Sequence, residues 1–426
     1  MHRFSKSFFT AILFTAVFSC SSGPAAEEPV SGQVGQTLST PRRLLPFVQL
    51  ADGRVLAAGG HDGTRTLSSC ELFDPATGLW SATGSLKVAR RNHAAVTLAD
   101  GRVLVAGGSP QQLVGMLASV ELFDPATGEW TTVAPMSVPR VDPTAVLLPD
   151  GRVLVVGGSD LDRRQLRSAE LFDPITGTWA TTEAPGWGHG GAQTAAVLKD
   201  GRVLFVSGMQ AELFEPSTGR WTKAGPAGGA AGTHRSGHTV TRLSDGRVLV
   251  VGGSTSRAAE TAELFDPATD TWTLVAPPHM PRESHGAVVT ADGAVLVVGG
   301  AHFSTGTLSS AEHFEPATGT WSLVTSLQAP RRGAGVVRLP GGEVLLVGGF
   351  NDAGGTLAST ERYMPGSGCV PATCAGQGGA CGVVADGCGG LLDCGPCDGG
   401  AQCASDDCDA GTEVDASVVI PVPIVR

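Results

Sequence analysis

Short apolar runs alternate along this chain with turns made of Gly, Pro, Asp and Thr. One such run, Arg152-Val-Leu-Val-Val, lies between an Asp150-Gly turn and a Gly-Gly pair; another, Ala169-Glu-Leu-Phe, is followed by Asp173-Pro-Ile-Thr-Gly and then Trp179. Short runs that are rich in Val, Leu and Phe and end at turn residues are typical of β-strands. No long helical period occurs, so we expect an all-β protein.

The same pattern is repeated along most of the chain. The Asp-Gly turn or its equivalent returns every 45 to 50 residues, at Asp52, Asp100, Asp150, Asp200, Asp245, Asp292 and Gly341. In six of the seven copies a Glu is followed nine residues later by a Trp, at Trp80, Trp130, Trp179, Trp221, Trp272 and Trp321. The seventh copy keeps Glu361 and has no such Trp. Self-similarity at this period predicts a repeat fold.

Each copy predicts four antiparallel strands. His93-Ala-Ala-Val-Thr-Leu and Arg102-Val-Leu-Val-Ala are joined by Ala-Asp-Gly, a hairpin signal because Gly tolerates positive φ. Ser119-Val-Glu-Leu-Phe supplies a third strand, and Trp130-Thr-Thr-Val follows a Pro-Ala-Thr-Gly turn as a fourth. A four-stranded sheet cannot bury both faces alone, and radial stacking of such sheets gives a β-propeller.

The Gly-Gly pair after an apolar strand, the Glu-Leu-Phe-Asp-Pro segment and the Trp nine residues after its Glu together resemble the kelch repeat. The resemblance covers residues 31–366 and implies a seven-bladed kelch-type β-propeller. The seventh copy lacks a fourth strand, whereas Val34 to Arg42 aligns with the fourth strand and following turn of another copy, Thr132 to Arg140. We therefore expect residues near 31–37 to close the ring as the outer strand of the last blade.

The N-terminus is typical of an export signal. A basic start and a short apolar run to Phe18 predict a signal peptide over residues 1–19, because the run is too short to span a bilayer. Val17-Phe-Ser-Cys20 resembles a bacterial lipobox, which implies acylation at Cys20 and a tether over residues 20–30. The sequence thus predicts an exported, membrane-anchored lipoprotein of the bacterial envelope or cell surface; the alternative is a secreted protein with an incidental Cys.

A cysteine-rich segment follows the repeats over residues 367–408. With few large apolar side chains it has no core, so we expect disulfides to stabilise it. The eight cysteines are Cys369, Cys374, Cys381, Cys388, Cys394, Cys397, Cys403 and Cys408. Zinc is the alternative, but the segment contains no His. Cys394-Gly-Pro-Cys397 resembles the thioredoxin tetrad without its context, and residues 409–426 are expected to be disordered.

Composition limits the class of partner. With 60 Gly and only 16% charged residues, the chain suits a turn-rich β fold. A formal charge of -11 and the absence of a Lys/Arg cluster beyond arginine pairs argue against nucleic acid. We expect a monomer without a cofactor, which meets the membrane only through its lipid anchor.

Two sets of repeated polar residues are candidates for either scaffold or chemistry. His93, His238 and His285 occupy one equivalent position, where packing is favoured over a metal site. An arginine ten residues before the Asp-Gly landmark recurs in six copies and is expected to pair with the repeated Glu or with main-chain carbonyls. These are Arg42, Arg90, Arg140, Arg235, Arg282 and Arg331.

Enzymatic chemistry is disfavoured by the side chains present. Kelch-type propellers include galactose oxidase, whose copper site uses two Tyr, one of them cross-linked to Cys, and two His. This chain has a single tyrosine, Tyr363, and a single propeller cysteine, Cys70, whose equivalents in other copies are small core residues. The turn before each Trp resembles the Asp-box of sialidases, which also need a Tyr nucleophile. We therefore predict that the protein is not an enzyme.

Binding is expected where the copies differ. The Asp-Gly and Pro-Ala-Thr-Gly turns should share one end of the blades, the uniform face; the loops after Gly-Gly and after the Trp strand should share the other, the varied face. Loop variation on a rigid scaffold builds binding sites. The candidates are Trp187, His189, Arg163, Arg164, His61, Arg257 and His302. The predicted partner is a protein or glycan, with a carbohydrate-active or oxidising enzyme and a purely structural envelope or adhesion component as alternatives.

Overall fold

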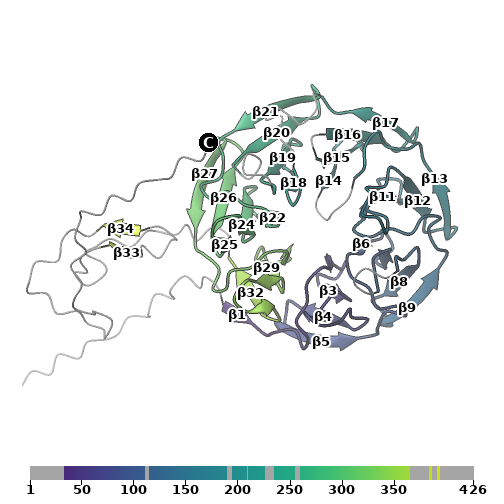
Figure 1. The fold of residues 1–426 in the computed structure, drawn as a ribbon, viewed down its shortest axis with the longest axis horizontal. Coiled ribbons are helices and arrows are strands. Elements are labelled where there is room, and N and C mark those ends of the chain that lie inside the picture. The colour runs from purple at the N-terminus through teal and green to yellow at the C-terminus, as the bar shows by residue number, and fades with distance from the viewer. Residues whose placement is uncertain are drawn as a thin grey trace, which may run out of the picture. The chain divides into compact units, whose positions relative to one another are not determined.

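Seven four-stranded antiparallel sheets are arranged around a central axis in the computed structural model (Figure 1). The structure describes residues 33–110, 115–189, 194–208, 210–225, 235–254 and 260–364, and the short segments 383–385 and 391–393. Within these residues every regular element is a strand. The all-β, seven-bladed propeller predicted from the repeat is confirmed.

The first four blades follow the chain from the inner strand outward. Blade one consists of β2 (Phe47–Gln49), β3 (Val55–Ala58), β4 (Cys70–Asp74) and β5 (Leu79–Thr83). Blade two consists of β6 (Ala94–Thr97), β7 (Val103–Ala106), β8 (Val120–Asp124) and β9 (Glu129–Val133). Blade three consists of β10 (Thr144–Leu147), β11 (Val153–Val156), β12 (Ala169–Asp173) and β13 (Thr178–Thr181). Blade four consists of β14 (Ala195–Val197), β15 (Val203–Ser207), β16 (Gln210–Glu215) and β17 (Arg220–Lys223).

The last three blades include the one that closes the ring. Blade five consists of β18 (Thr239–Arg242), β19 (Val248–Val251), β20 (Ala262–Asp266) and β21 (Thr271–Val275). Blade six consists of β22 (Gly286–Val289), β23 (Val295–Val298), β26 (Ala311–Glu315) and β27 (Thr320–Val324). Blade seven consists of β28 (Gly335–Arg338), β29 (Val344–Val347), β32 (Thr360–Tyr363) and, from the other end of the chain, β1 (Gln33–Gly35).

Short hairpins complete the described elements. They are β24 (Ala301–His302) with β25 (Gly306–Thr307), β30 (Phe350–Asn351) with β31 (Gly355–Thr356), and β33 (Val383–Ala385) with β34 (Leu391–Asp393). The cysteines from Cys369 to Cys408 and the lipidation candidate Cys20 lie outside the described residues. Within the described part of the chain, no helix has the length and apolar character of a membrane span.

The predicted ring closure is confirmed by the pairing of β1 with β32. Gln33 lies opposite Arg362, and Gly35 lies opposite Thr360, in antiparallel register. The amide of Leu38 then donates to the carbonyl of Ala358, and the Leu38 side chain is buried. This pairing covers the edge that blade seven would otherwise expose.

The hydrophobic core lies between blades. The second strand of each blade is buried along its whole length, as in β3 and β7, because neighbouring sheets cover both of its faces. One cluster joins Leu56 of blade one to Val105 and Phe123 of blade two, and another joins Val55 of blade one to Leu345 of blade seven. Cys70 is buried in the first of these clusters, as predicted for a small core residue.

The uniform face links neighbouring blades through backbone carbonyls. Arg54, in the Asp-Gly hairpin of blade one, pairs with Asp52 and donates to the carbonyl of Pro125 in the turn of blade two at 3.1 Å. The same contact is made by Arg152 with Pro216, Arg202 with Pro267, and Arg247 with Pro316. The two repeated turns therefore lie at one end of the blades and join them.

Candidate functional site

The repeated arginines are buried inside the blades. In blade two, Arg90 Nη2 lies 2.6 Å from Glu121 Oε1, and Nη1 donates to the carbonyls of Gly107 and Ser119. The pairs are Arg42–Glu71, Arg90–Glu121, Arg140–Glu170, Arg235–Glu263, Arg282–Glu312 and Arg331–Glu361. The prediction that these arginines pair with the repeated Glu and with carbonyls is confirmed.

Blade four uses a histidine in place of the arginine. His189 Nε2 lies 2.7 Å from Glu212 Oε2, and its ring stacks on Trp221 with centroids 5.8 Å apart and planes 16° apart. The side chain is fully buried. The sequence assigned His189 to the binding surface, and this is corrected because the side chain satisfies the carboxylate that an arginine satisfies elsewhere. The missing seventh arginine was the signal for this role.

His61 is also less accessible than its loop position suggested. It is 7% exposed, its backbone pairs with that of Arg43, and its Nδ1 accepts the amide hydrogen of Gly63 at 3.0 Å. Burial, and then the charges of Arg91 and Arg43, lower the pKa of this imidazole. Instead of projecting from the loop, His61 is held among cationic side chains.

Three other predicted residues lie on the varied face with partners of their own. Trp187 is half-buried, with the Arg167 guanidinium 5.7 Å from its ring centroid. Arg164 is exposed and pairs with Asp162 at 3.1 Å, while His302 Nδ1 lies 2.8 Å from Ser304 Oγ.

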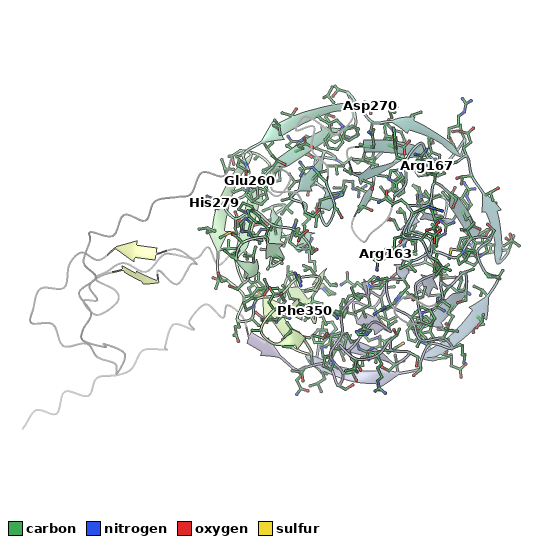
Figure 2. All side chains as sticks on the ribbon, in the orientation of Figure 1. Arg163, Arg167, Glu260, Asp270, His279 and Phe350 are labelled. Carbon is green, nitrogen blue, oxygen red and sulfur yellow. The ribbon has the colours of Figure 1, made fainter. Side chains whose placement is uncertain are left out.

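Arg163 differs from these three residues because it has no ion pair among the described residues. It is exposed, with a left-handed φ of 60°, and Figure 2 shows it on the side of its blade toward the central opening. The candidate Arg257 lies outside the described residues.

The axial pocket opens at the centre of the varied face. Its volume is about 670 Å³, and residues at the start of the innermost strands of all seven blades line it. Its rim is set by the second residue after the repeated arginine, which has a left-handed φ wherever it is described: Leu44, Asn92, Asp142, Gly237, Ser284 and Gly333. Backbone bonds join these positions from blade to blade, as from Asn92 N to Leu44 O at 2.8 Å.

The histidines of the pocket wall act as neutral packing residues. His238 Nε2 lies 3.1 Å from Val206 O, and His285 Nε2 lies 2.9 Å from Thr239 Oγ1. Burial, and then the charge of Arg90, lower the pKa of His93 to about 3, and burial lowers that of His285 well below its usual value. Among the described residues no group of three or more His, Cys, Asp or Glu is placed to hold a metal ion.

One carboxylate in the pocket wall was missed by the sequence prediction. Asp142 is the only acidic residue that lines the axial pocket in the described structure, and its carboxylate forms no ion pair with the described residues. The surrounding protein raises the pKa of this carboxyl by desolvation. It sits where other blades have Leu44 or Gly333, so only the alignment of the copies could have drawn attention to it.

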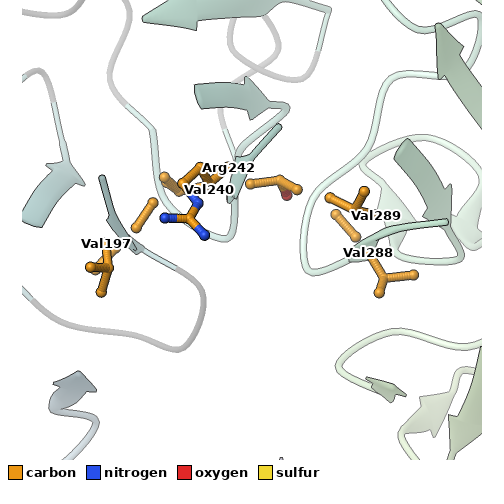
Figure 3. Close-up of a pocket in the computed structure, with 9 residues that line it drawn as sticks. Val197, Val240, Arg242, Val288 and Val289 are labelled. Carbon is orange, nitrogen blue, oxygen red and sulfur yellow. The ribbon is translucent and has the colours of Figure 1, made fainter. Parts of the chain in front are cut away.

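A second pocket lies on the innermost strands that surround the central axis (Figure 3). Val197, Val240 and Val289 of β14, β18 and β22 line it together with Arg242, and its volume is about 430 Å³. Its walls are three adjacent innermost strands, which run from the axial pocket toward the Asp-Gly turns of the uniform face.

The sequence prediction also missed a row of cationic and ring side chains beside the pocket. The guanidinium carbons of Arg43 and Arg332 lie 4.8 and 5.0 Å from the ring centroid of Phe350. Figure 2 shows Phe350 on blade seven. His61 is the next member of the row, beside Arg43. The positive charges of Arg43 and of Arg91, in blade two, lower the pKa of His61, and the charge of Arg43 lowers the pKa of Arg91. We call Arg332, Phe350, Arg43, His61 and Arg91 the arginine arc; its sequence signal was the doubling of the repeated arginine in three consecutive blades.

Many solved structures share this fold. The chain is similar to a structure described as a novel fungal alcohol oxidase with catalytic diversity among the AA5 family, in complex with copper. The TM-score is 0.64 and the identity 20%, over 79% of this chain and 76% of that chain. No curated protein matches. At this identity the likeness shows the fold alone.

This likeness corrects the prediction that the protein is not an enzyme, because the same fold carries a copper oxidase. The described residues nevertheless do not fit a copper site. Tyr363 is buried in the core between blades six and seven, where desolvation raises the pKa of its hydroxyl, and it does not line the axial pocket. His238 and His285 already contact Val206 O and Thr239 Oγ1.

The repeat itself identifies the family. The kelch motif matches residues 46–87, 90–137, 142–181, 234–279 and 284–328, which together exceed half of the chain. These segments fall on blades one, two, three, five and six, in each of which the repeated Glu is buried against the repeated arginine. The chain therefore belongs to the kelch-repeat family.

Proposed function

We propose that this protein is a binding propeller that engages a protein or glycan partner through its varied face. The contrast between the two faces supports this proposal. Turns on the uniform face are used to join blades, as in the contact of Arg54 with Pro125. The varied face surrounds a pocket of about 670 Å³ with side chains that differ from blade to blade.

The proposed contact residues combine cations with exposed apolar side chains. Leu161 and Phe303 are 68% and 76% exposed in the loops of blades three and six. Large apolar and Arg side chains on a rigid base are typical of residues that dominate binding energy. The candidates beside them are Trp187, Arg163, Arg164 and His302, together with Arg257.

An array of glycans and surface proteins, probed with the full chain, tests this proposal. Once a ligand is found, Trp187→Ala and the charge reversal Arg163→Glu/Arg164→Glu should weaken it roughly tenfold, since loop residues over a preformed ring carry contact energy. Thr127→Ala and Thr176→Ala, in turns of the uniform face, are matched controls and should bind normally. Loss of affinity in the turn variants alone would assign binding to the opposite face.

Catalysis is a second candidate, and the observation behind it is the fold match with a copper alcohol oxidase. The described residues offer no copper ligand set, so binding remains the preferred function. The test is an assay for hydrogen peroxide with copper-treated protein and a panel of primary alcohols. Copper-dependent peroxide release would replace the binding proposal with an oxidase.

Export and anchoring are proposed from the sequence. Cys20→Ala should release the protein from the membrane fraction and abolish labelling by a fatty-acid analogue. Mass spectrometry of the exported protein should find the cysteines from Cys369 to Cys408 oxidised. Unchanged acyl labelling would remove the first proposal, and four or more free thiols would remove the second.

A further inference from the structure

We propose that the arginine arc binds carboxylate side chains of an acidic peptide segment, with Arg43 and Arg91 as the principal contacts. This rests on the proposed function, because it names the chemistry of a partner for the varied face. The arc crosses three adjacent blades and borders the axial pocket, whose rim includes Leu44, Asn92 and Gly333, each the residue after an arginine of the arc.

The geometry holds the arc in place without a negative charge at its centre. The guanidinium carbons of Arg43 and Arg332 lie 4.8 and 5.0 Å from the ring centroid of Phe350. The backbones of Arg43 and His61 exchange hydrogen bonds of 3.1 and 2.9 Å. Cation–π contacts of this kind position guanidinium groups and leave their N–H edges free for an anion.

Two arginines of the arc, Arg43 and Arg91, have no ion pair among the described residues. Arg91 is 8% exposed, and its guanidinium has no carboxylate or hydrogen-bond acceptor among them. Arg43 Nε is buried without a partner in the same part of the structure. Desolvation, and then the charge of Arg43, lower the pKa of Arg91. A guanidinium nitrogen that is buried without an acceptor, as Arg43 Nε is, is unfavourable, and an incoming anion would supply that acceptor.

Neighbouring acids do not fill this role. Asp352 pairs with Arg332 at 3.3 Å, which satisfies the outer end of the arc. Asp62 accepts hydrogen bonds from Thr64 and Arg65 of its own turn. Arg43 and Arg91 therefore remain without a carboxylate partner, and the charges of both act on His61.

His61 adds a neutral donor to this position. Its Nδ1 accepts the Gly63 amide, which assigns the proton of the neutral ring to Nε2. An N–H beside two guanidinium groups suits a carboxylate oxygen, which accepts several hydrogen bonds at once.

The shape of the arc favours an acidic peptide over an acidic sugar. Two guanidinium groups, those of Arg43 and Arg332, already lie within 5.0 Å of the Phe350 ring centroid, which leaves less of this ring open for a sugar to stack on. Only a small part of Arg91 is exposed, and a carboxylate on a flexible Asp or Glu side chain reaches it more easily than one fixed to a pyranose ring. A peptide with two such residues would span Arg43 and Arg91.

Fluorescence anisotropy with the full chain tests the proposal. The probe is a labelled peptide of alternating Gly, Asp and Glu; the same peptide with Asn and Gln, and a labelled oligogalacturonate, are the comparisons. We expect the acidic peptide alone to bind, more weakly as salt rises. Arg43→Met and Arg91→Met should each reduce its affinity roughly tenfold. Arg220→Met, at an exposed arginine on the outer strand β17 of blade four, is the matched control and should leave it unchanged.

A second readout needs no substitution at the arc. In the wild-type protein, saturation with the acidic peptide should raise the pKa of His61, followed by NMR of its ring, because a carboxylate offsets the charges of Arg43 and Arg91. An unshifted His61, or equal affinity in Arg91→Met, overturns the arc as the site. Preference for oligogalacturonate overturns the peptide and favours a glycan. Affinity lost in Arg163→Met or Arg164→Met but kept in Arg43→Met and Arg91→Met overturns the arc and leaves the varied-face proposal standing. Peptide affinity that survives all four of these substitutions contradicts both.

Discussion

Three pairs of consecutive arginines place the same side chain in two different environments. The first member of each pair is buried against a glutamate and backbone carbonyls, as Arg90 is against Glu121, Gly107 and Ser119. The second member lies in the arginine arc, where Arg91 is 8% exposed, against 0% for Arg90, and has no acceptor among the described residues. The pairs are Arg42-Arg43, Arg90-Arg91 and Arg331-Arg332.

The difference separates residues that build the ring from residues that are available for a partner. The first arginine recurs in six blades and has the same contacts each time, so its role is in the scaffold. The second occurs in three consecutive blades, and at the same position blade three has Val141 and blade six has Glu283. A positive charge that is present on only one side of a symmetric ring favours the binding of anions on that side.

The largest effect is expected from removing the strand that completes the scaffold. Deletion of residues 31–40 takes away β1, the buried Leu38 and the amide of Ser39 that donates to Glu71. It exposes the edge of β32, so we expect aggregation or a fall in Tm greater than for any substitution below. Thermal unfolding and light scattering measure this. Deletion of residues 21–30 is the control, and equal melting of the two proteins would contradict ring closure by β1.

The next largest effect is expected at a buried pair. Arg90→Met should lower the free energy of unfolding by about 3–5 kcal/mol, because Glu121 keeps its charge without the guanidinium. The double variant Arg90→Met/Glu121→Met should be more stable than the single one, since no charge remains buried. Urea unfolding at neutral pH measures both. Wild-type stability in Arg90→Met would remove the scaffold role assigned to the repeated arginines.

A smaller effect, visible only in acid, is expected at the pocket wall. Burial holds the pKa of His93 at about 3, below the 6.5 of an ordinary histidine, so the unfolded chain binds a proton that the folded protein does not. The resulting stability is complete above about pH 6.5 and falls as the pH drops toward 3, by up to roughly 1.4 kcal/mol per pH unit. His93→Leu, which copies Leu45 of blade one, should reduce this slope in urea unfolding between pH 7 and 4. An unchanged slope would mean that His93 is not buried as a neutral ring.

The sequence predicted the fold well because the fold depends on repeated local signals. Each Asp-Gly, Gly-Gly and Glu-Leu-Phe segment predicts a turn or strand, and seven copies reinforce one another. Gly59 and Gly60 show the physical reason for one of these signals: both have positive φ, and a Cβ on Gly59 would lie 2.6 Å from the carbonyl oxygen of Arg90. The missing fourth strand of the seventh copy was equally informative, because an open edge has to be covered.

The site was predicted less well because its residues depend on contacts between blades. His189 was interpreted as a loop residue, although the absence of an arginine before Glu212 makes it the partner of that carboxylate. The arginine arc depends on Phe350 and Arg43, which lie side by side only because blade seven meets blade one. No local pattern shows whether a guanidinium has an acceptor, so Arg90 and Arg91 cannot be distinguished within one copy.

The most direct test of this distinction is the stability of Arg91→Met beside that of Arg90→Met. Both substitutions remove a guanidinium at adjacent residues, and urea unfolding at neutral pH gives the free energy of each variant relative to the wild type. If Arg91 is kept for a partner, its replacement should leave the unfolding free energy within about 0.5 kcal/mol of the wild type or raise it, because no carboxylate loses a partner. A loss of about 3 kcal/mol or more, equal to that of Arg90→Met, would show that Arg91 belongs to the scaffold and would contradict the account.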